Sequence, residues 1–225
     1  MMPSLKQMPS SDLTDTASRI LDAAEHLFAE HGFTETSLRS ITTRAGVNLA
    51  AVNYHFGSKE ALVQAVFERF LTPFCRRLDR ELDEAMARGD GQSPPLHDLF
   101  GLLARTMLAG VEDSTNDSKL SIFMRLLGLA YTQSQGHLRR FLRDHYDSTY
   151  RRFVLLVHQT TPHVSPNELF WRIHFAVGSA VFTMGSVETL RAIARNDTHQ
   201  DNTLEDILHK LVPFVANALN DDRDH

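Results

Sequence analysis

Apolar residues recur at intervals of three and four along most of the chain, and this spacing predicts amphipathic helices. The first such segment runs from Asp15 to Glu30. Its apolar stripe consists of Ile20, Leu21, Ala24, Leu27 and Phe28. Gly32 follows this segment and can adopt the left-handed conformation that ends a helix. We therefore expect the first helix to end at His31-Gly32.

The same periodicity continues to the C-terminus, in segments bounded by capping residues, glycine or proline. Further helices are predicted at Leu38–Ala45, Leu49–His55, Lys59–Arg88, Leu96–Glu112, Lys119–Thr132, Gly136–Gln159, Pro166–Arg195 and Leu204–Asn220. Pro73 lies inside one of them and should kink it, because proline lacks an amide donor. The stretch from Gly89 to Pro95 is a predicted linker. The pattern predicts an all-α fold.

The predicted helices fall into a small N-terminal group and a larger C-terminal group. Residues 1–13 contain Pro3, Pro9 and several serines and are expected to form a flexible tail. Residues 14–60 are expected to form a small domain of three helices. Residues 61–225 are expected to form a larger helical domain.

Two short helices with a tight turn between them predict the helix-turn-helix. Ser37 can cap the first helix and Asn48 the second. Gly46 lies between them, where the backbone must turn sharply. The apolar brace that fixes the angle between the helices would consist of Leu38, Ile41, Ala45, Val47, Val52 and Phe56.

The second of these helices is the predicted recognition helix, which would lie in the major groove of DNA. It would present Asn48, Leu49, Ala51, Asn53 and Tyr54 to the bases. Asparagine can pair with adenine, whereas leucine and alanine can contact thymine methyl groups. Phosphate contacts are expected from Tyr54, His55, Lys59, Ser37 and Thr42.

Local charge supports this interpretation, although the whole chain has a formal net charge of -5. The window from Ser37 to Lys59 contains Arg39, Arg44 and Lys59 and no acidic residue. Phosphate binding depends on where positive charge is placed and not on the total charge. The acid-free window therefore marks the expected DNA-binding surface.

A resemblance to a known family covers roughly residues 17–67. It rests on Ile20-Leu21-Asp22-Ala23-Ala24, Phe28-Ala29-Glu30-His31-Gly32-Phe33, Thr36-Ser37-Leu38-Arg39-Ser40-Ile41, Ala45-Gly46-Val47-Asn48 and Val52 through Leu62. These runs resemble the DNA-binding domain of TetR-family transcriptional regulators. The resemblance implies a homodimer that binds palindromic double-stranded operator DNA and responds to a small ligand. The family usually has an aromatic residue at Asn53 and a polar or basic residue at Leu49, so an operator preference is not carried over.

A closer resemblance runs from Asn48 to Lys59 and continues through Val66-Phe67, Arg69-Phe70-Leu71 and Pro73-Phe74. It is to the PsrA-type, fatty-acid-responsive repressors of the same family. That resemblance implies a repressor of fatty-acid metabolism and of its own gene. A long-chain fatty acid or acyl-CoA would release it from DNA. The alternative is another apolar effector, such as a drug.

The helices of the C-terminal domain carry apolar residues on more than one face. Most of these residues are expected to form ordinary core, and the resemblance implies a ligand pocket between the helices. Arginine, histidine or tyrosine could orient an acyl carboxylate or thioester there. The candidate ligand-binding residues are Phe123, Arg125, Leu127, Tyr131, His145, Phe153 and His174.

The last two predicted helices are candidates for a dimer interface. The run from Phe175 to Gly185 mixes large apolar residues with small ones, which allow helices to approach closely. The final helix has an apolar stripe of Leu204, Ile207, Leu208, Leu211, Val212, Val215 and Leu219. A four-helix bundle across a two-fold axis would match a palindromic DNA site. Packing within one chain is the alternative.

Composition narrows the possible functions. No apolar run is long enough for a membrane span, and the N-terminus lacks the apolar core of a signal peptide, so we expect a cytoplasmic protein with no membrane partner. Cys75 is the only cysteine, which excludes an internal disulfide. Motifs of nucleotide-binding, phosphate-binding and hydrolytic enzymes are absent, and the twelve histidines show no ligand spacing. We expect no enzymatic activity, no cofactor and no metal.

Two other classes of protein are the alternatives to this prediction. One is an enzyme, for which the sequence offers no catalytic motif. The other is a helical interaction module without DNA binding, which would leave the acid-free window from Ser37 to Lys59 unexplained.

Overall fold

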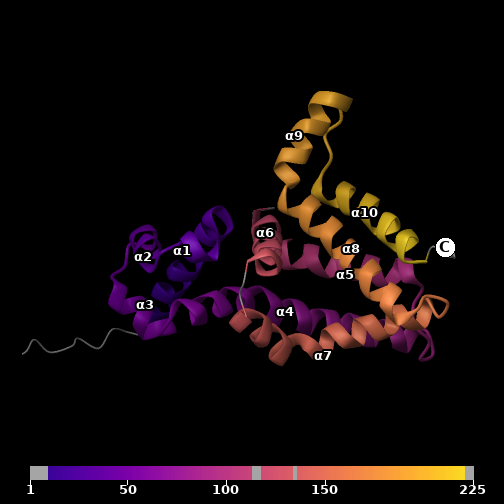
Figure 1. The fold of residues 1–225 in the computed structure, drawn as a ribbon, viewed down its shortest axis with the longest axis horizontal. Coiled ribbons are helices and arrows are strands. Elements are labelled where there is room, and N and C mark those ends of the chain that lie inside the picture. Colours follow the sequence, from indigo (N-terminus) through magenta and orange to yellow (C-terminus); the bar gives the residue numbers. More distant parts are fainter. Residues whose placement is uncertain (1–9, 113–117, 134–135, 221–225) are drawn as a thin grey trace, which may run out of the picture. The chain divides into compact units, whose positions relative to one another are not determined.

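A computed structural model describes residues 10–112, 118–133 and 136–220, and the regular secondary structure of these residues is helical (Figure 1). The all-α prediction is confirmed. The helices are α1 (Ser10–Glu35), α2 (Leu38–Ala45), α3 (Leu49–Phe56), α4 (Lys59–Arg88), α5 (Leu96–Glu112), α6 (Ser118–Thr132), α7 (Gly136–Thr160), α8 (Pro166–Gly185), α9 (Val187–Thr198) and α10 (Leu204–Asn220).

The chain forms two compact units, with the division between Glu68 and Arg69. The N-terminal unit contains α1, α2, α3 and the first ten residues of α4. The C-terminal unit contains the rest of α4 and the helices α5 to α10. One helix, α4, therefore contributes residues to both units.

The N-terminal unit is built on an apolar core contributed by all four of its helices. Its fully buried side chains are Ile20 and Phe28 from α1, Phe33, Ile41 from α2, Val52 from α3, and Leu62 and Phe67 from α4. The ring of Phe33 lies 5.5 Å from that of Phe28 and 6.2 Å from that of Phe67. The second ring contact joins α1 to α4. Each apolar stripe identified in the sequence for this region contributes to this core.

The ends of α1 differ in part from the prediction. The helix begins at Ser10, so residues 10–13, which were expected in the flexible tail, are helical. Residues 1–9 of that tail lie outside the described residues. Gly32 leaves helical geometry with φ 81° and ψ 168°, at the predicted end of the first helix. The buried hydroxyl of Thr36 donates to the carbonyls of Leu27 and Gly32, at 3.0 and 2.8 Å, and fixes this turn.

In the C-terminal unit α6 packs against α8, while α5 packs against α10 (Figure 1). Its main core cluster draws on five helices and the loop between α7 and α8. The cluster comprises Leu78, Leu82, Leu96, Leu99, Leu102, Leu156, Val157, Val164, Leu169, Val215, Ala216 and Leu219. The predicted stripe of the final helix thus faces the interior of its own chain at Leu204, Leu208, Val215 and Leu219. The expectation that this stripe forms an intermolecular surface is corrected for these four residues.

Polar contacts join α4 to α7. The hydroxyls of Thr72 and Tyr146 lie 2.8 Å apart, and Thr149 donates to Asp79 Oδ2 at 2.7 Å. Further along, Arg152 donates to Asp83 Oδ1 at 2.6 Å and pairs with Asp79 at 3.5 Å. These residues are named the α4–α7 seam below. The seam fixes the rotation of α4 and α7 about their own axes. It therefore determines which of their side chains face the interior.

The predicted helix Pro166–Arg195 is two helices, because α8 ends at Gly185 and α9 begins at Val187. The carbonyl of Gly185 accepts a hydrogen bond from Arg125 Nε of α6 at 2.7 Å. A Cβ added at Gly185 would lie 3.5 Å from Arg125 Cγ and 3.6 Å from the Arg125 nitrogen. The helix breaks at Ser186 because Gly185 packs closely on α6 and its carbonyl is bound by Arg125. Helical periodicity in the sequence reports neither contact.

The fully buried Leu82 provides a test of the C-terminal core. Leu82→Ala should lower the free energy of unfolding by about 2–5 kcal/mol, because it leaves a cavity where the core cannot fully close. Leu155→Ala is the matched control, since Leu155 of α7 is 62% exposed and its change should be within about 0.5 kcal/mol. Urea unfolding followed by circular dichroism measures both. Equal effects of the two substitutions would contradict the described core.

Candidate nucleic-acid interface and ligand cavity

A side-chain cap begins each of the two helices of the helix-turn-helix. Ser37 Oγ accepts from the backbone nitrogen of Ser40 at 3.0 Å and begins α2. Asn48 Oδ1 accepts from the backbone nitrogen of Ala51 at 2.9 Å and begins α3. Both residues fill the capping positions that the sequence predicted.

The turn between α2 and α3 depends on Gly46. Its φ of 65° and ψ of 37° are left-handed, a region that side chains disfavour. The backbone nitrogens of Gly46 and Val47 donate to the carbonyls of Thr43 and Thr42, at 3.3 and 3.0 Å. This pair of bonds is the Schellman arrangement that ends helices. The result is a turn of three residues that fixes α3 at a defined angle to α2.

Arg19 of α1 holds the same turn from outside. Its Nη2 donates to the carbonyl of Ala45 at 2.6 Å and to that of Gly46 at 3.2 Å. A Cβ at Gly46 would lie 2.9 Å from this atom, so the guanidinium packs directly on the glycine. Positive charge at the C-terminus of α2 is also favourable toward the helix dipole. Sequence reasoning missed Arg19, because nothing in its spacing shows that it reaches the turn.

The outer surface of α3 carries the predicted base contacts. Tyr54 is 74% exposed and Leu49 is 49% exposed, and Asn48 and Asn53 are also exposed. Ala51 is half-buried, while Val52 faces the core. The structure therefore brings these residues together on one short helix whose opposite face is anchored. An exposed leucine and tyrosine there are available to a partner.

The predicted phosphate contacts differ in their surroundings. Ser37 is exposed, and His55 and Lys59 are half-buried. Lys59 Nζ lies 3.2 Å from the carbonyl of Thr34, to which it donates. Thr42 is the exception, because its side chain is buried and its hydroxyl donates to the carbonyl of Arg39 at 2.9 Å. Thr42 supports α2 from within and does not reach the surface.

Two arginines of α2 add positive charge to this surface. Arg44 pairs with Glu30 at 3.5 Å, whereas the side chain of Arg39 is exposed. Among the described residues the Arg39 guanidinium has no ion pair or hydrogen bond. Arg39 was not among the predicted contact residues. The acid-free window that contains it was the available signal.

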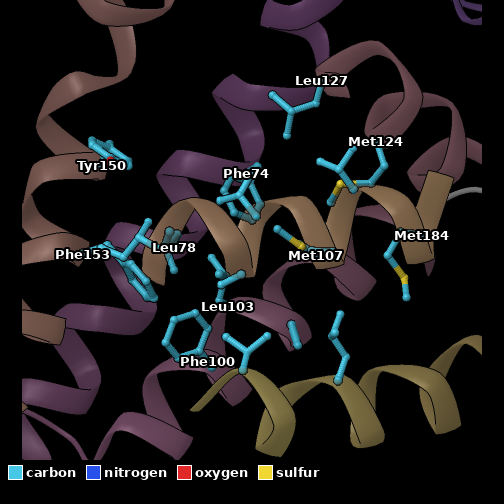
Figure 2. Close-up of a pocket in the computed structure, with 18 of the residues that line it drawn as sticks. Phe74, Leu78, Phe100, Leu103, Met107, Met124, Leu127, Tyr150, Phe153 and Met184 are labelled. Carbon is cyan, nitrogen blue, oxygen red and sulfur yellow. The ribbon is translucent and has the colours of Figure 1, made fainter. Parts of the chain in front are cut away.

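The C-terminal unit contains a cavity of about 300 Å³ between α4, α5, α6, α7, α8 and α10. Figure 2 shows Phe74, Leu103, Met107 and Met184 around this space, with Tyr150 and Phe153 of α7 on one side. Its volume is at the lower end of the range for small-molecule sites, roughly 300–1,000 Å³. The cavity is large enough to hold a small apolar ligand.

Two of the predicted ligand residues, Leu127 and Phe153, line this cavity, and five others do not. Phe123 stacks on Phe70, with ring centroids 3.7 Å apart, and Arg125 is bound to Gly185. Tyr131 and His145 are exposed and His174 is half-buried. Each of the two histidines forms a hydrogen bond with a carbonyl of its own helix, Phe141 or Phe170. The predicted polar head-group site is therefore not assembled at the cavity.

Four polar side chains line the cavity instead, and none was predicted as a ligand contact. They are Cys75, Tyr146, Thr149 and Tyr150. Burial, together with the Asp79 carboxylate, raises the pKa of the Cys75 thiol from 9.0 to about 11. Burial also raises the pKa of Tyr150, with further contributions from Tyr131 and Asp147. Helical periodicity gives no sign that Tyr146 and Tyr150 border a cavity.

The outer face of α8 carries large aromatic residues. Trp171, Phe175 and Phe182 are 51%, 66% and 64% exposed, and they repeat along one face of the helix. Gly178 lies on the same face, and a Cβ there would meet nothing within 4 Å. Phe214 of α10 is 62% exposed. Such a concentration of exposed aromatic surface is unusual for a monomer.

Among the described residues, no helix is both long and apolar enough to cross a membrane.

Two models of known protein families match this chain. Residues 20–66 match the model of bacterial regulatory proteins of the tetR family, and residues 103–218, more than half of the chain, match the model of the tetracyclin repressor-like C-terminal domain. The chain therefore belongs to the tetR family of transcriptional regulators, which is not a class of enzymes. The family part of the resemblance is confirmed.

Individual relatives match over the N-terminal region. The HTH-type transcriptional repressor Rv3405c of Mycobacterium tuberculosis is 42% identical over 76 residues, 34% of this chain and 40% of that protein. The HTH-type transcriptional regulator UidR of Escherichia coli is 40% identical over 63 residues, 26% of this chain and 32% of that protein. The chain thus spans less than half the length of these relatives.

Solved structures agree in fold along nearly the whole chain. A mutant of HlyIIR superimposes with a TM-score of 0.61 at 17% identity and covers 96% of this chain and all of that one. NalD, the secondary repressor of the MexAB-OprM multidrug efflux pump in Pseudomonas aeruginosa, has a TM-score of 0.55 at 20% identity, with 93% and 98% covered. At these identities the likeness shows the fold alone.

The two hydrogen bonds from Arg19 to the turn, called the Arg19 clamp below, can be tested by removing this side chain. Arg19→Ala should speed amide hydrogen exchange at Gly46 and Val47 several-fold, because two charge-assisted hydrogen bonds at a partly exposed site contribute about 1 kcal/mol. Asp15→Ala is the control, because it removes the ion pair of Asp15 with Arg19, at 4.0 Å, and leaves the two hydrogen bonds from Arg19 to the turn in place. Hydrogen exchange measured by NMR gives both rates. Unchanged protection at Gly46 in Arg19→Ala would show that the clamp is dispensable.

Proposed function

We propose that this protein is a DNA-binding transcriptional repressor that acts as a homodimer in the cytoplasm and is released from operator DNA by a small apolar effector. The observation that carries the proposal is the exposed outer face of α3, fixed by the glycine turn and the Arg19 clamp. A helix held rigidly by its inner face can present a reproducible set of side chains to a DNA groove.

In this proposal α3 reads bases and its surroundings bind phosphates. Asn48, Asn53, Leu49, Ala51 and Tyr54 lie on or at the start of α3 and provide amide groups for adenine and apolar groups for thymine methyls. Asn48 uses its carbonyl oxygen for the cap, which leaves its NH₂ group for DNA. The proposed phosphate contacts are the Tyr54 hydroxyl, Ser37, His55, Lys59 and the exposed Arg39.

A second copy of the chain is the proposed partner of the aromatic face of α8. Burying Trp171, Phe175, Phe182 and Phe214 removes large apolar side chains from water. The open position at Gly178 lets two such helices approach closely. A two-fold dimer also explains how two recognition helices would match a palindromic site.

The effector is proposed to bind the cavity of the C-terminal unit. The PsrA-type resemblance suggests a long-chain fatty acid or acyl-CoA, and another apolar molecule is the alternative. The cavity accommodates an apolar chain in either case, since aliphatic and aromatic side chains dominate its lining. With a fatty acid or acyl-CoA as effector, the regulated genes would be those of fatty-acid metabolism and the protein's own gene.

Coupling between ligand and DNA is proposed to pass along α4. This helix contributes residues to both units, and its residues Leu71, Phe74, Cys75 and Leu78 line the cavity. A ligand shifts the equilibrium between two states only by its differential affinity for them. Pro73 lies inside this lining stretch and is the proposed bending point.

Substitutions on α3 and at the start of α4 separate base reading from phosphate binding. Tyr54→Phe and Lys59→Ala should weaken binding to every duplex by a similar factor, and Lys59→Ala should lower the salt slope by about 1. Asn53→Ala should instead lose about 1–3 kcal/mol of discrimination between sequences. Mobility shifts on operator and scrambled duplexes at two salt concentrations measure both effects.

Lys119→Ala provides the control for these variants, because Lys119 is an exposed lysine of the C-terminal unit and should leave DNA binding unchanged. Unaltered affinity in both Tyr54→Phe and Lys59→Ala would remove the phosphate assignment. Binding that does not weaken as salt rises would contradict the DNA-binding function itself.

The dimer is tested by placing charge on α8. Phe182→Glu should raise the dimer dissociation constant at least about tenfold, because a buried unpaired carboxylate costs more than about 1.4 kcal/mol. Leu155→Glu is the control, since Leu155 is similarly exposed but lies on α7. Sedimentation equilibrium measures the association. If Phe182→Glu and Leu155→Glu leave the dimer dissociation constant equally unchanged, the interface lies elsewhere.

A further inference from the structure

We propose that the cavity of the C-terminal unit takes an uncharged apolar molecule and discriminates against one with an ionised carboxylate. This inference concerns the class of ligand and rests on the proposed function only in treating the cavity's occupant as the effector. It chooses between the two effector classes left open above, since a free fatty acid is ionised at neutral pH.

Apolar residues make up most of the cavity lining. Among the described residues around the cavity, none is a lysine, arginine, histidine, aspartate or glutamate. A carboxylate placed there would lose water and gain no cation in return. Moving an unpaired charge into an apolar site is unfavourable by a large margin. A hydrocarbon chain faces no such penalty and gains from burial.

Two polar groups of the lining already have hydrogen-bond partners. The Tyr146 hydroxyl is hydrogen-bonded to Thr72, and the Thr149 hydroxyl donates to Asp79. Both bonds belong to the α4–α7 seam, so a ligand that took them would have to break it. The Thr149 hydrogen is therefore committed to Asp79, and the Tyr146 hydroxyl is already engaged with Thr72.

A negative charge lies next to the cavity lining. Asp79 lies directly behind the lining, where its carboxylate and local burial together keep the Cys75 thiol protonated. The same two factors act against any other anion near Cys75. Asp79 is paired with Arg152, but that arginine also donates to Asp83. The Asp79–Arg152–Asp83 group thus offers no spare positive charge to the cavity.

The remaining polar group suits a neutral ligand. Tyr150 lines the cavity (Figure 2) and is 50% exposed. Among the described residues it has no hydrogen bond to protein. A phenol with a raised pKa stays a donor and can serve an ester, ketone or alcohol oxygen. The site therefore fits an apolar molecule with at most one neutral acceptor.

The test compares three ligands of equal chain length: decanoic acid, methyl decanoate and decan-1-ol. Isothermal titration of the full chain at about pH 8 keeps the acid ionised. The ester and the alcohol should bind, and the acid should bind at least about tenfold more weakly. Acid that binds as tightly as the ester would overturn the proposal.

Two variants show that the cavity is the site. Leu103→Trp should abolish ester binding by filling the space, and continued tight binding in a folded Leu103→Trp protein would overturn the proposal. Met107→Lys places a cation in the lining and should reverse the preference toward the acid. If Met107→Lys does not fold, Leu127→Lys provides the same charge from α6. A folded cation variant that gains nothing for the acid would contradict the proposal.

DNA binding is measured separately, by mobility shift without ligand, so the two proposals fail independently. Selective binding of the neutral ligands by a protein that ignores DNA would defeat the proposed function and leave this inference standing. A protein that binds DNA but binds the acid and the ester with equal affinity would support the proposed function and defeat this inference.

Discussion

The left-handed turn at Gly46 is the constraint on which the DNA-reading surface depends. A side chain at this position would both strain the backbone and collide with the Arg19 guanidinium, 2.9 Å away. The turn is held by two backbone bonds from within and by Arg19 from outside. Because α3 is only eight residues long, its stability comes from this turn and from Val52, not from its own length. Rigid placement of a short helix is what base reading requires.

Helix boundaries were predictable wherever a local signal set them. The bounds of α2, α4, α5 and α10 follow from periodicity and cap residues alone, as does the capping by Ser37 and Asn48. The break between α8 and α9 was not predictable, because its cause is the Arg125 side chain of another helix. For the same reason Arg125, expected at a ligand head group, is used in packing. Local patterns do not report long-range contacts.

The candidate sites show the same division. The outer face of α3 was predictable, because one short helix carries it and the buried Val52 fixes its orientation. The cavity was not, because its lining comes from six helices and sequence spacing relates residues only within one. The aromatic face of α8 lies between these cases: Phe175 and Phe182 were in the predicted interface, but the apolar stripe of α10 serves its own core. The PsrA-type effector is implied by a resemblance over the stretch from Asn48 to Phe74, whereas the lining of the cavity favours an uncharged ligand.

Selection of binding sites from a random duplex library, followed by sequencing, tests whether a two-fold dimer reads DNA sequence through α3, whatever the operator sequence is. A dimer of this kind should enrich one palindrome whose half-sites are separated by about 10 base pairs or a multiple of that distance. Asn53→Ala should change the enriched bases, and Lys119→Ala should not. Failure to enrich any palindrome, with protein that is folded and dimeric, would show that sequence is not read in this way.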